Sequence, residues 1–366
     1  MKNERKNILV VSDPPAAPGY LPRVRALCDY LVQKGHDVTL LTEEHEPLLF
    51  AHTYPIQAIR MYNGSTLDWF IKTVWTLFTD WHDRVFARRA LVAIQGKYDL
   101  VICSAFSDFP LGAAQRIATA MNVPLICDIR DLDEQVEDSR YQYSHQSWLL
   151  MPFRKLYRAI HIRRRNKVLR TADAITTVSP WHADFIKQFN GHVSVIYNGF
   201  DQKQFYPEDI RTDEFRITYI GSLFDWQKPA LEKVRQIADE LQIALDIHTP
   251  QHNPITHNEL GYTIRQSCIM LVLTNEHTHG MLTTKFYEAF GCEKPVLCVP
   301  SDQGALAELI AYTNAGIATD NVKEIKEFIL THYKAWEKDG FTRQRTQHRD
   351  EFVRETQYDQ YYSTCI

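Results

Sequence analysis

The feature that most constrains this chain is a repeated alternation of short apolar runs with stretches of helical periodicity. The first runs, residues 8–11 and 38–41, are continuous and rich in β-branched residues, which is typical of strands buried on both faces of a sheet. Between them, apolar residues recur at helical spacing until Gly35. Strands that alternate with helices in this way predict a parallel sheet covered by helices.

The alternation occurs in two series, separated by a polar and irregular stretch at 200–215 that resembles an interdomain linker. Further strands are predicted at 100–103, 124–129, 174–178 and 193–197 in the first series, and at 217–220, 243–247, 269–273 and 296–299 in the second. We therefore predict an α/β protein with two Rossmann-like domains, 1–202 and 203–343. A surface helix with one apolar stripe is expected in the remaining residues, 344–366.

Composition argues against several classes of protein. The formal net charge is −4 and the isoelectric point is about 6.4, so a polyanion partner such as nucleic acid is not indicated, and no nucleic-acid-binding motif is present. Seven cysteines without CxxC spacing fit neither a disulfide framework nor a zinc site, and are expected to be buried in a reducing cytosol. Without a signal peptide or a membrane-spanning run, the protein is expected to be cytoplasmic.

The most informative stretch follows the predicted strand at 269–273. A loop there leads into a short helix that carries Lys285 in its first turn and Glu288 one turn later. Free backbone N–H groups and the positive end of the helix dipole suit a phosphate, Lys285 can add a charge, and Glu288 can accept hydrogen bonds from a ribose diol. The alternative is an ordinary surface helix with a Lys–Glu pair at i, i+3.

This stretch, with Lys294-Pro295 behind it, resembles the donor-binding signature K-x-x-E-x-x-x-x-x-K/R-P of glycosyltransferase family 4. Three further stretches resemble family motifs in the same order along the chain. They are the opening run from Pro14 through Gly19 and Arg23, the run Val178-Ser179 followed by 193–201, and Tyr219-Ile220-Gly221-Ser222-Leu223 with Lys228.

The resemblance implies the GT-B arrangement, in which two Rossmann-like domains face an active-site cleft and a last helix crosses back onto the first domain. It implies retaining, metal-independent transfer of a sugar from a nucleotide-diphosphate sugar, a UDP-sugar in preference to a GDP-sugar, with no other cofactor. The acceptor would be a saccharide or a lipid-linked group in cell-surface polysaccharide or glycolipid synthesis. The N-terminal domain would be the acceptor side.

Carried over residue by residue, the resemblance assigns donor binding to several positions. Glu288 would hold the ribose, and Lys285, Ser222 and Lys228 would contact the diphosphate. Gly19 would allow the backbone to approach the donor or acceptor. Many members carry a second glutamate eight residues before the ribose-binding one, but this chain has Gly280 there and resembles a branch that lacks it. The backbone of Gly280, Met281 and Leu282 would then contact the donor sugar.

A second candidate lies after the predicted strand at 124–129, where the run from Asp128 to Asp133 resembles the D-x-R-D-L-W run of the same branch. Arg130 could stabilise the leaving phosphate and Asp131 could orient an acceptor hydroxyl, so we take both as the catalytic candidates. The alternative is an Arg–Asp pair that only stabilises a loop. No metal site is predicted, because His182, His277 and His279 match no metal-binding spacing.

The segment from Trp148 to Arg170 combines an aromatic and apolar start with eight basic residues. Such a basic amphipathic helix would suit an anionic surface, here the inner face of the membrane, although a solvated helix face has the same pattern. Two other functions share the same domain shape. These are a nucleotide-sugar epimerase, which needs no acceptor, and a partner that binds a nucleotide sugar without turning it over.

Overall fold

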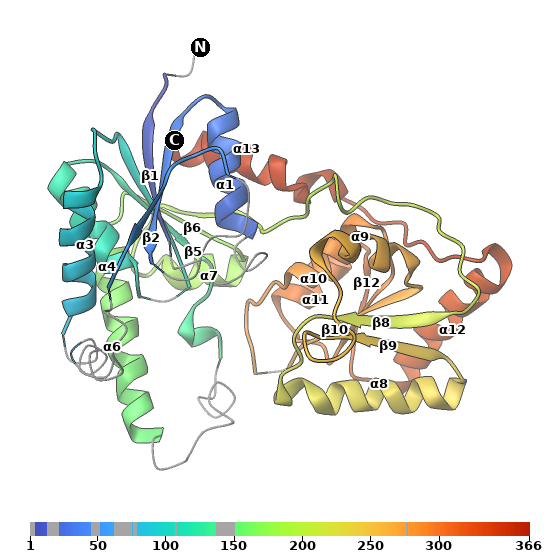
Figure 1. The fold of residues 1–366 in the computed structure, drawn as a ribbon. Coiled ribbons are helices and arrows are strands. Elements are labelled where there is room, and N and C mark those ends of the chain that lie inside the picture. Colours follow the sequence, from blue (N-terminus) through green and yellow to red (C-terminus); the bar gives the residue numbers. More distant parts are fainter. Residues whose placement is uncertain are drawn as a thin grey trace.

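The computed structural model describes residues 4–12, 22–44, 52–61, 75, 79–106, 108–136, 151–275 and 277–366. These residues form two lobes, each built on a parallel sheet (Figure 1). We call the lobe that contains β1 to β7 the N lobe, and the lobe that contains β8 to β12 the C lobe. Both sheets and their helical covers agree with the predicted fold class.

The N-lobe sheet has the strand order β3-β2-β1-β4-β5-β6-β7, and all of its pairs are parallel. Its strands are β1 (Asn7–Ser12), β2 (Asp37–Glu43), β3 (Ile56–Ile59), β4 (Leu100–Ala105), β5 (Leu125–Ile129), β6 (Ala174–Thr177) and β7 (Val193–Val195). Its helices are α1 (Pro22–Gln33), α3 (Trp81–Ala93), α4 (Leu111–Met121), α6 (Met151–Leu169) and α7 (Pro180–Ile186), with a 3-10 turn η1 (Asp133–Gln135).

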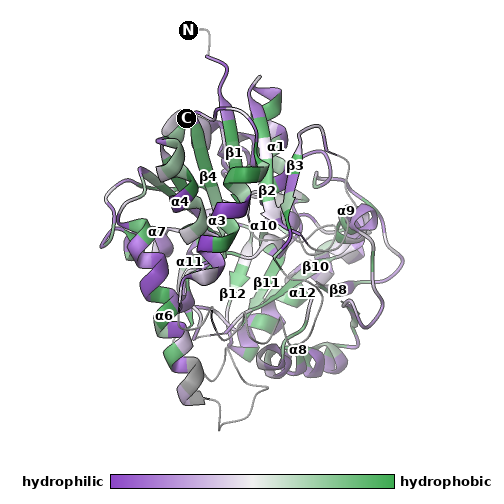
Figure 2. Ribbon diagram, turned by 60° about the vertical axis from the view of Figure 1, so that its left-hand side comes forward, coloured by the Kyte–Doolittle hydropathy of each residue, from purple (hydrophilic) through white to green (hydrophobic). Residues whose placement is uncertain are grey.

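The side chains of β1 alternate between two cores, which explains why this strand is apolar throughout. Leu9 and Val11 pack with Phe86 of α3 and Ile117 of α4 on one face. Ile8 and Val10 pack with α1 and the C-terminal helix on the other face. A strand buried on both sides cannot alternate apolar with polar residues, because each face is a core. In Figure 2 the strands β1 and β4 are coloured as hydrophobic, whereas much of α6 is coloured as hydrophilic.

The C-lobe sheet is parallel with the order β12-β11-β10-β8-β9. Its strands are β8 (Arg216–Ile220), β9 (Ala244–His248), β10 (Ile269–Leu273), β11 (Val296–Val299) and β12 (Gly316–Ala318). Its helices are α8 (Lys228–Leu241), α9 (His257–Gln266), α10 (Thr284–Gly291), α11 (Ala305–Tyr312) and α12 (Val322–Asp339), with a 3-10 turn η3 (Asp225–Gln227). The chain reverses its winding direction between β8 and β10, where ligands bind in open parallel sheets.

The structure adds elements that the sequence analysis did not predict. Two are the edge strands β3 and β12, which have four and three residues, too few to show a clear period. The helices α9 and α11 were also not predicted. The predicted C-terminal helix begins later than expected, since a 3-10 turn η4 (Arg349–Phe352) and the extended residue Val353 precede α13 (Arg354–Cys365).

Two stretches of chain cross between the lobes side by side. The Phe200 N–H donates to Phe352 O at 3.1 Å, and the Arg354 N–H donates to Phe200 O at 2.9 Å. Beyond this pairing, α13 packs on α1, where Tyr358 Oη donates to Arg23 O at 2.8 Å. The last helix therefore crosses back onto the N lobe, as predicted (Figure 1). Across the described ranges, no helix combines the length and the apolar character that a membrane span requires.

Candidate active site

Lys285 lies at the start of α10, which follows β10. Thr283 caps this helix, since its hydroxyl accepts a hydrogen bond from the Lys285 N–H. The Lys285 ammonium lies 4.7 Å from the ring centroid of Tyr219, on β8, and donates to Tyr219 Oη at 3.1 Å. Burial lowers the pKa of Lys285 to about 8, although the nearby Glu288 carboxylate opposes this shift. The ammonium is therefore held at the reversal point between β8 and β10.

Gly221 leaves the room that Lys285 occupies. A Cβ atom built on Gly221 would lie 2.4 Å from Lys285 Cε, and the φ angle of Gly221 is +127°, which only glycine adopts readily. The glycine of the Y-x-G run therefore allows the lysine of the K-x-x-E run to cross the end of β8. Tyr219 joins the two runs, because its hydroxyl also donates to Ser222 O at 2.6 Å.

Glu288 lies one turn after Lys285 and is partly buried. Burial raises the pKa of its carboxyl to about 7, and the charges of Arg354 and Lys285 only partly offset this effect. Within the part of the chain that the structure describes, its carboxylate makes no hydrogen bond and feels Arg354 and Lys285 only as nearby charges. A carboxylate of this kind remains available to a hydrogen-bond donor from a ligand.

The side chains of Ser222 and Lys228 are exposed. The Lys228 ammonium pairs with the Asp225 carboxylate at 2.6 Å. Ser222 is tied to Lys285 only through the Tyr219 hydroxyl. The structure therefore brings Ser222, Lys285 and Glu288 to one end of the C-lobe sheet, while Lys228 is neutralised by its own neighbour.

The loop from Gly280 to Leu282 lies against the N lobe. Gly280 is buried with φ +67°, and a Cβ atom there would lie 2.9 Å from the Trp181 side chain at the start of α7. The Trp181 and His279 rings stack with centroids 5.9 Å apart. A glutamate at position 280 has no room in this arrangement. The departure from the family pattern is thus accompanied by a close contact between the lobes.

The second candidate pair follows β5. Asp131 is partly buried, and burial raises the pKa of its carboxyl to about 6, against the hydrogen bond that Gln135 Nε2 donates to Asp131 Oδ1 at 3.2 Å. The Arg130 guanidinium is buried over the ring of Phe106, 3.5 Å from its centroid. These two residues stand at the carboxyl end of the N-lobe sheet.

The loops that follow β5 and β10 touch each other in a direct contact between the lobes. Val136 and Thr278 form an antiparallel bridge, and the His279 N–H donates to Gln135 O at 2.7 Å. The loop that carries Asp131 therefore touches the loop that leads to Lys285. Sequence reasoning did not identify Gln135, because nothing in its spacing links it to either motif.

The remaining sequence predictions have other outcomes. Gly19 and residues 148–150 lie outside the described residues. Nowhere in the described segments do three or more histidine, cysteine or carboxylate side chains gather as a metal site would require. His182 instead bonds Gln135 Oε1 through Nε2 at 2.9 Å.

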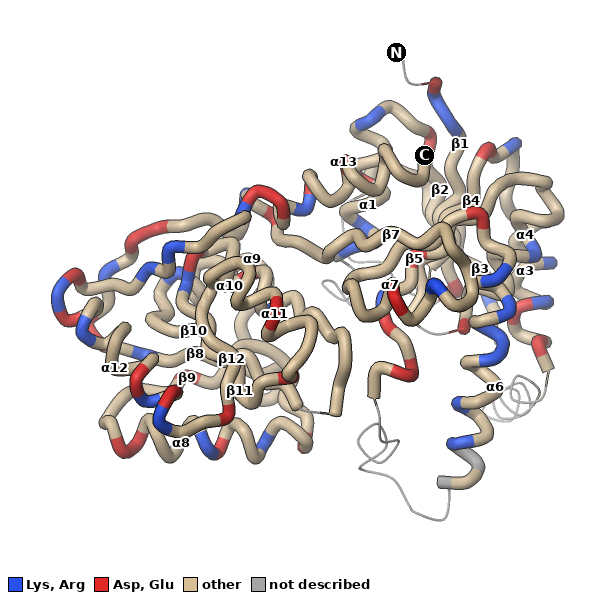
Figure 3. The backbone as a smooth tube through the Cα atoms, turned by 180° about the vertical axis from the view of Figure 1, so that it is seen from behind, with Lys and Arg blue, Asp and Glu red and all other residues tan. Residues whose placement is uncertain are grey.

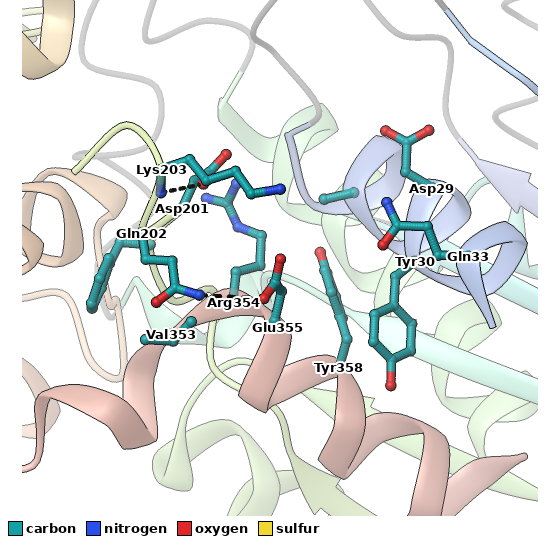
Figure 4. Close-up of a pocket in the computed structure, with 12 residues that line it drawn as sticks. Asp29, Tyr30, Gln33, Asp201, Gln202, Lys203, Val353, Arg354, Glu355 and Tyr358 are labelled. Carbon is teal, nitrogen blue, oxygen red and sulfur yellow. Dashed lines mark hydrogen bonds between the residues drawn. The ribbon is translucent and has the colours of Figure 1, made fainter. Parts of the chain in front are cut away.

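A separate cavity of about 160 Å³ lies where the two crossing stretches meet α1 (Figure 4). None of the nine predicted site residues that the structure describes lines it. Its polar lining comes from the linker, α1 and α13, and it consists of Asp29, Tyr30, Gln33, Asp201, Gln202, Lys203, Arg354, Glu355 and Tyr358, with Ala26, Phe200 and Val353 as apolar members.

Comparison with known proteins identifies one family model and one fold. Residues 23–204 match the family model described as Glycosyltransferase Family 4. Sucrose-phosphate synthase from Thermosynechococcus elongatus has a similar structure, with a TM-score of 0.63 at 17% identity over 98% of each chain. No curated protein sequence matches this chain.

Two further solved structures share the fold over their full length. The Anabaena HepE protein in complex with UDP and glucose aligns with a TM-score of 0.59 at 13% identity, over 98% of this chain and 99% of its own. The lipopolysaccharide outer core galactosyltransferase WaaB aligns with a TM-score of 0.59 at 12% identity, over 98% of each chain. At these identities the likeness shows the fold, which is the GT-B arrangement.

Proposed function

Because this chain belongs to glycosyltransferase family 4, we propose that it transfers a sugar from a nucleotide-diphosphate sugar to a saccharide or lipid-linked acceptor. The observation that supports this most strongly is the backbone contact between the two loops that carry the candidate residues. Lys285 and Glu288 stand at the end of the C-lobe sheet, and the loop before them contacts the loop that carries Asp131.

In this proposal the C lobe holds the donor. Glu288 accepts hydrogen bonds from the ribose diol, and its raised pKa suits a carboxylate that a ligand must still satisfy. Lys285, the backbone at the start of α10, Ser222 and Lys228 stabilise the diphosphate. Lys228 must exchange its Asp225 partner for the phosphate. UDP is the favoured nucleotide over GDP, on the family resemblance alone.

The N lobe supplies the acceptor side. Asp131 orients the acceptor hydroxyl, whose oxygen bonds the anomeric carbon on the face from which the diphosphate departs. The proton of that hydroxyl passes to the departing phosphate oxygen, and the anomeric configuration is retained without a metal ion. Arg130 would add positive charge near this step.

Calorimetric titration with UDP, GDP and ADP tests the donor site. We expect binding of UDP, and a loss of at least about tenfold in affinity for Glu288→Gln and Lys285→Met, because each removes one charge-assisted hydrogen bond. The matched control is Lys323→Met, since Lys323 forms an exposed Lys–Glu pair with Glu327 on α12. Equal affinities for all four proteins would contradict the donor assignment.

A second experiment tests the reaction. The protein is incubated with each UDP-sugar, with water as the surrogate acceptor, in EDTA, and the first anomer released is read by NMR. Retention predicts the anomer of the donor. Conversion of the donor to another UDP-sugar without release would indicate an epimerase instead, and binding without any turnover would indicate a non-catalytic partner.

We also propose that α6 contacts an anionic membrane surface, as a lipid-linked acceptor would require. Figure 3 shows basic positions along this helix. They divide into two groups, because Arg165 is buried against Glu134 at 2.6 Å and Arg158 donates to Val136 O at 3.1 Å. The exposed remainder comprises Lys155, Arg163, Lys167 and Arg170, beside Leu156, which is 52% exposed.

Sedimentation with vesicles tests this contact. We expect the protein to bind vesicles that contain phosphatidylglycerol but not vesicles of phosphatidylcholine alone, and the binding to weaken with salt. The variant Lys155→Glu/Arg163→Glu/Lys167→Glu should lose it. Equal binding of this variant would show that α6 is only a solvated helix face.

A further inference from the structure

Gln135 occupies the point where the two lobes touch. Its carbonyl oxygen accepts the His279 N–H of the C lobe at 2.7 Å, and the next residue, Val136, forms the bridge with Thr278. Its side chain, in contrast, is buried and forms hydrogen bonds with residues of the N lobe. One residue therefore contacts both the donor-side loop and the candidate acceptor residue.

The orientation of the Gln135 amide is fixed by His182. This histidine is fully buried at the start of α7, and burial, assisted by the charge of Arg165, lowers its pKa to about 4. It is therefore neutral, and its Nε2 lies 2.9 Å from Gln135 Oε1. Because an amide oxygen can only accept, Nε2 must carry the hydrogen. The amide NH₂ group then faces Asp131, where Nε2 of Gln135 lies 3.2 Å from Oδ1.

An amide NH₂ group can only donate, so it favours the ionised form of the Asp131 carboxyl and holds one of its two oxygens. Oδ2 makes no hydrogen bond within the described residues and is free to accept one. The other charged groups that act on Asp131 are Arg130, which favours its ionised form, and Asp133, which opposes it.

We propose that Gln135, held by His182, is a positioning residue that orients the Asp131 carboxylate toward the acceptor hydroxyl and ties this orientation to docking of the donor-side loop. This inference rests on the proposed function, because it gives Asp131 the acceptor role. It also accounts for Gly280, since a side chain there would meet Trp181 and separate the two loops.

The test replaces the amide without changing its length. In Gln135→Met the backbone contact with His279 is kept, while the hydrogen bond to Asp131 is lost. We expect kcat for donor turnover to fall by about 10- to 100-fold with little change in the donor KM, because orientation is lost and donor binding is not. The acid limb of the pH–rate profile should move to higher pH. Gln188→Met is the matched control, since Gln188 is exposed.

A second variant guards against a folding defect. His182→Leu leaves Gln135 in place but frees its amide to rotate, so we expect the same changes in smaller measure. An unchanged kcat and an unchanged pH profile in Gln135→Met, or in His182→Leu if the first variant does not fold, would overturn the inference. Asp131→Asn distinguishes failure of the proposed role of Asp131 from failure of the positioning role of Gln135. If it retains full turnover, the proposed role of Asp131 fails. If it is inactive while Gln135→Met is normal, only the positioning role fails.

Discussion

The two aspartates of the D-x-R-D run should respond to mutation in opposite ways, and this difference tests which of them serves the chemistry. Asp128 is fully buried at the end of β5. It accepts two hydrogen bonds from the Arg23 guanidinium, at 2.8 and 3.0 Å, and one each from the hydroxyls of Ser104 and Thr176 at 2.8 Å. We expect Asp128→Asn to destabilise the N lobe and Asp131→Asn to abolish turnover without unfolding it.

The magnitude follows from the burial of the ion pair. The side chains of Arg23 and Asp128 are 6% and 1% exposed, and removal of one partner of such a pair costs about 3–5 kcal/mol, because the remaining charge stays buried without compensation. An asparagine also turns an NH₂ group toward groups that donate. Burial raises the pKa of the Asp131 carboxyl, so its replacement by the neutral Asn should not lower the free energy of unfolding at neutral pH.

The pH dependence gives an independent check. Burial pushes the pKa of Asp128 upward, but the Arg23 charge and the hydrogen-bond donors outweigh it, so the pKa lies below its ordinary value. A carboxyl with a depressed pKa stabilises the folded state above its unfolded pKa, near 4, and this contribution is lost as the pH falls through the folded pKa. The difference between wild type and Asp128→Asn should therefore shrink below about pH 4.

Urea unfolding provides the measurement, with hydrogen exchange on β4 and β5 to assign the transition to the N lobe, since two lobes need not unfold together. Asp37→Asn is the control, because Asp37 forms an exposed ion pair with Arg5 and should leave the unfolding midpoint unchanged. A loss of less than about 1 kcal/mol in Asp128→Asn, together with a large loss of turnover, would refute the reasoning and move the chemical role to Asp128.

Three further outcomes follow from the same structure. Glu288→Gln should raise the free energy of unfolding at pH 8 by about 2 kcal/mol, because burial makes the ionised carboxylate unfavourable above pH 7. An unchanged urea midpoint would show that the ionised carboxylate does not destabilise the folded state. Affinity for UDP should fall as the pH rises through about 8, where Lys285 loses its charge, and calorimetry should find no such decline in Lys285→Met. Gly112→Ala should lower thermal stability by about 1–3 kcal/mol, since its Cβ atom would lie 2.7 Å from the Asp83 carboxylate, whereas Gly191→Ala, with no atom within 4 Å, should not.

Much of the fold follows from local sequence. Ten predicted strands appear in the structure, because a strand buried on both faces has a continuous apolar, β-branched sequence that can be recognised without knowing which strands it pairs with. The K-x-x-E run also carries its own geometry, since a helix places residues three apart on one face. The short edge strands β3 and β12 could not be found in this way, because pairing with β2 and β11 creates them.

Other properties depended on residues that are distant in the chain. Asp128 and Arg23 are 105 positions apart, and Gln135 and His182 are 47 apart. Of the basic residues in the segment 148–170, the sequence could not show that Arg165 is buried against Glu134 while Arg163 is exposed. Sequence alone determined which segments become strands and helices, and it singled out the K-x-x-E run as the candidate donor-binding motif. Only the tertiary structure decided which aspartate is a buried ion-pair partner, and why position 280 is a glycine, because burial, charge pairing and steric room exist only after the chain has brought distant groups together.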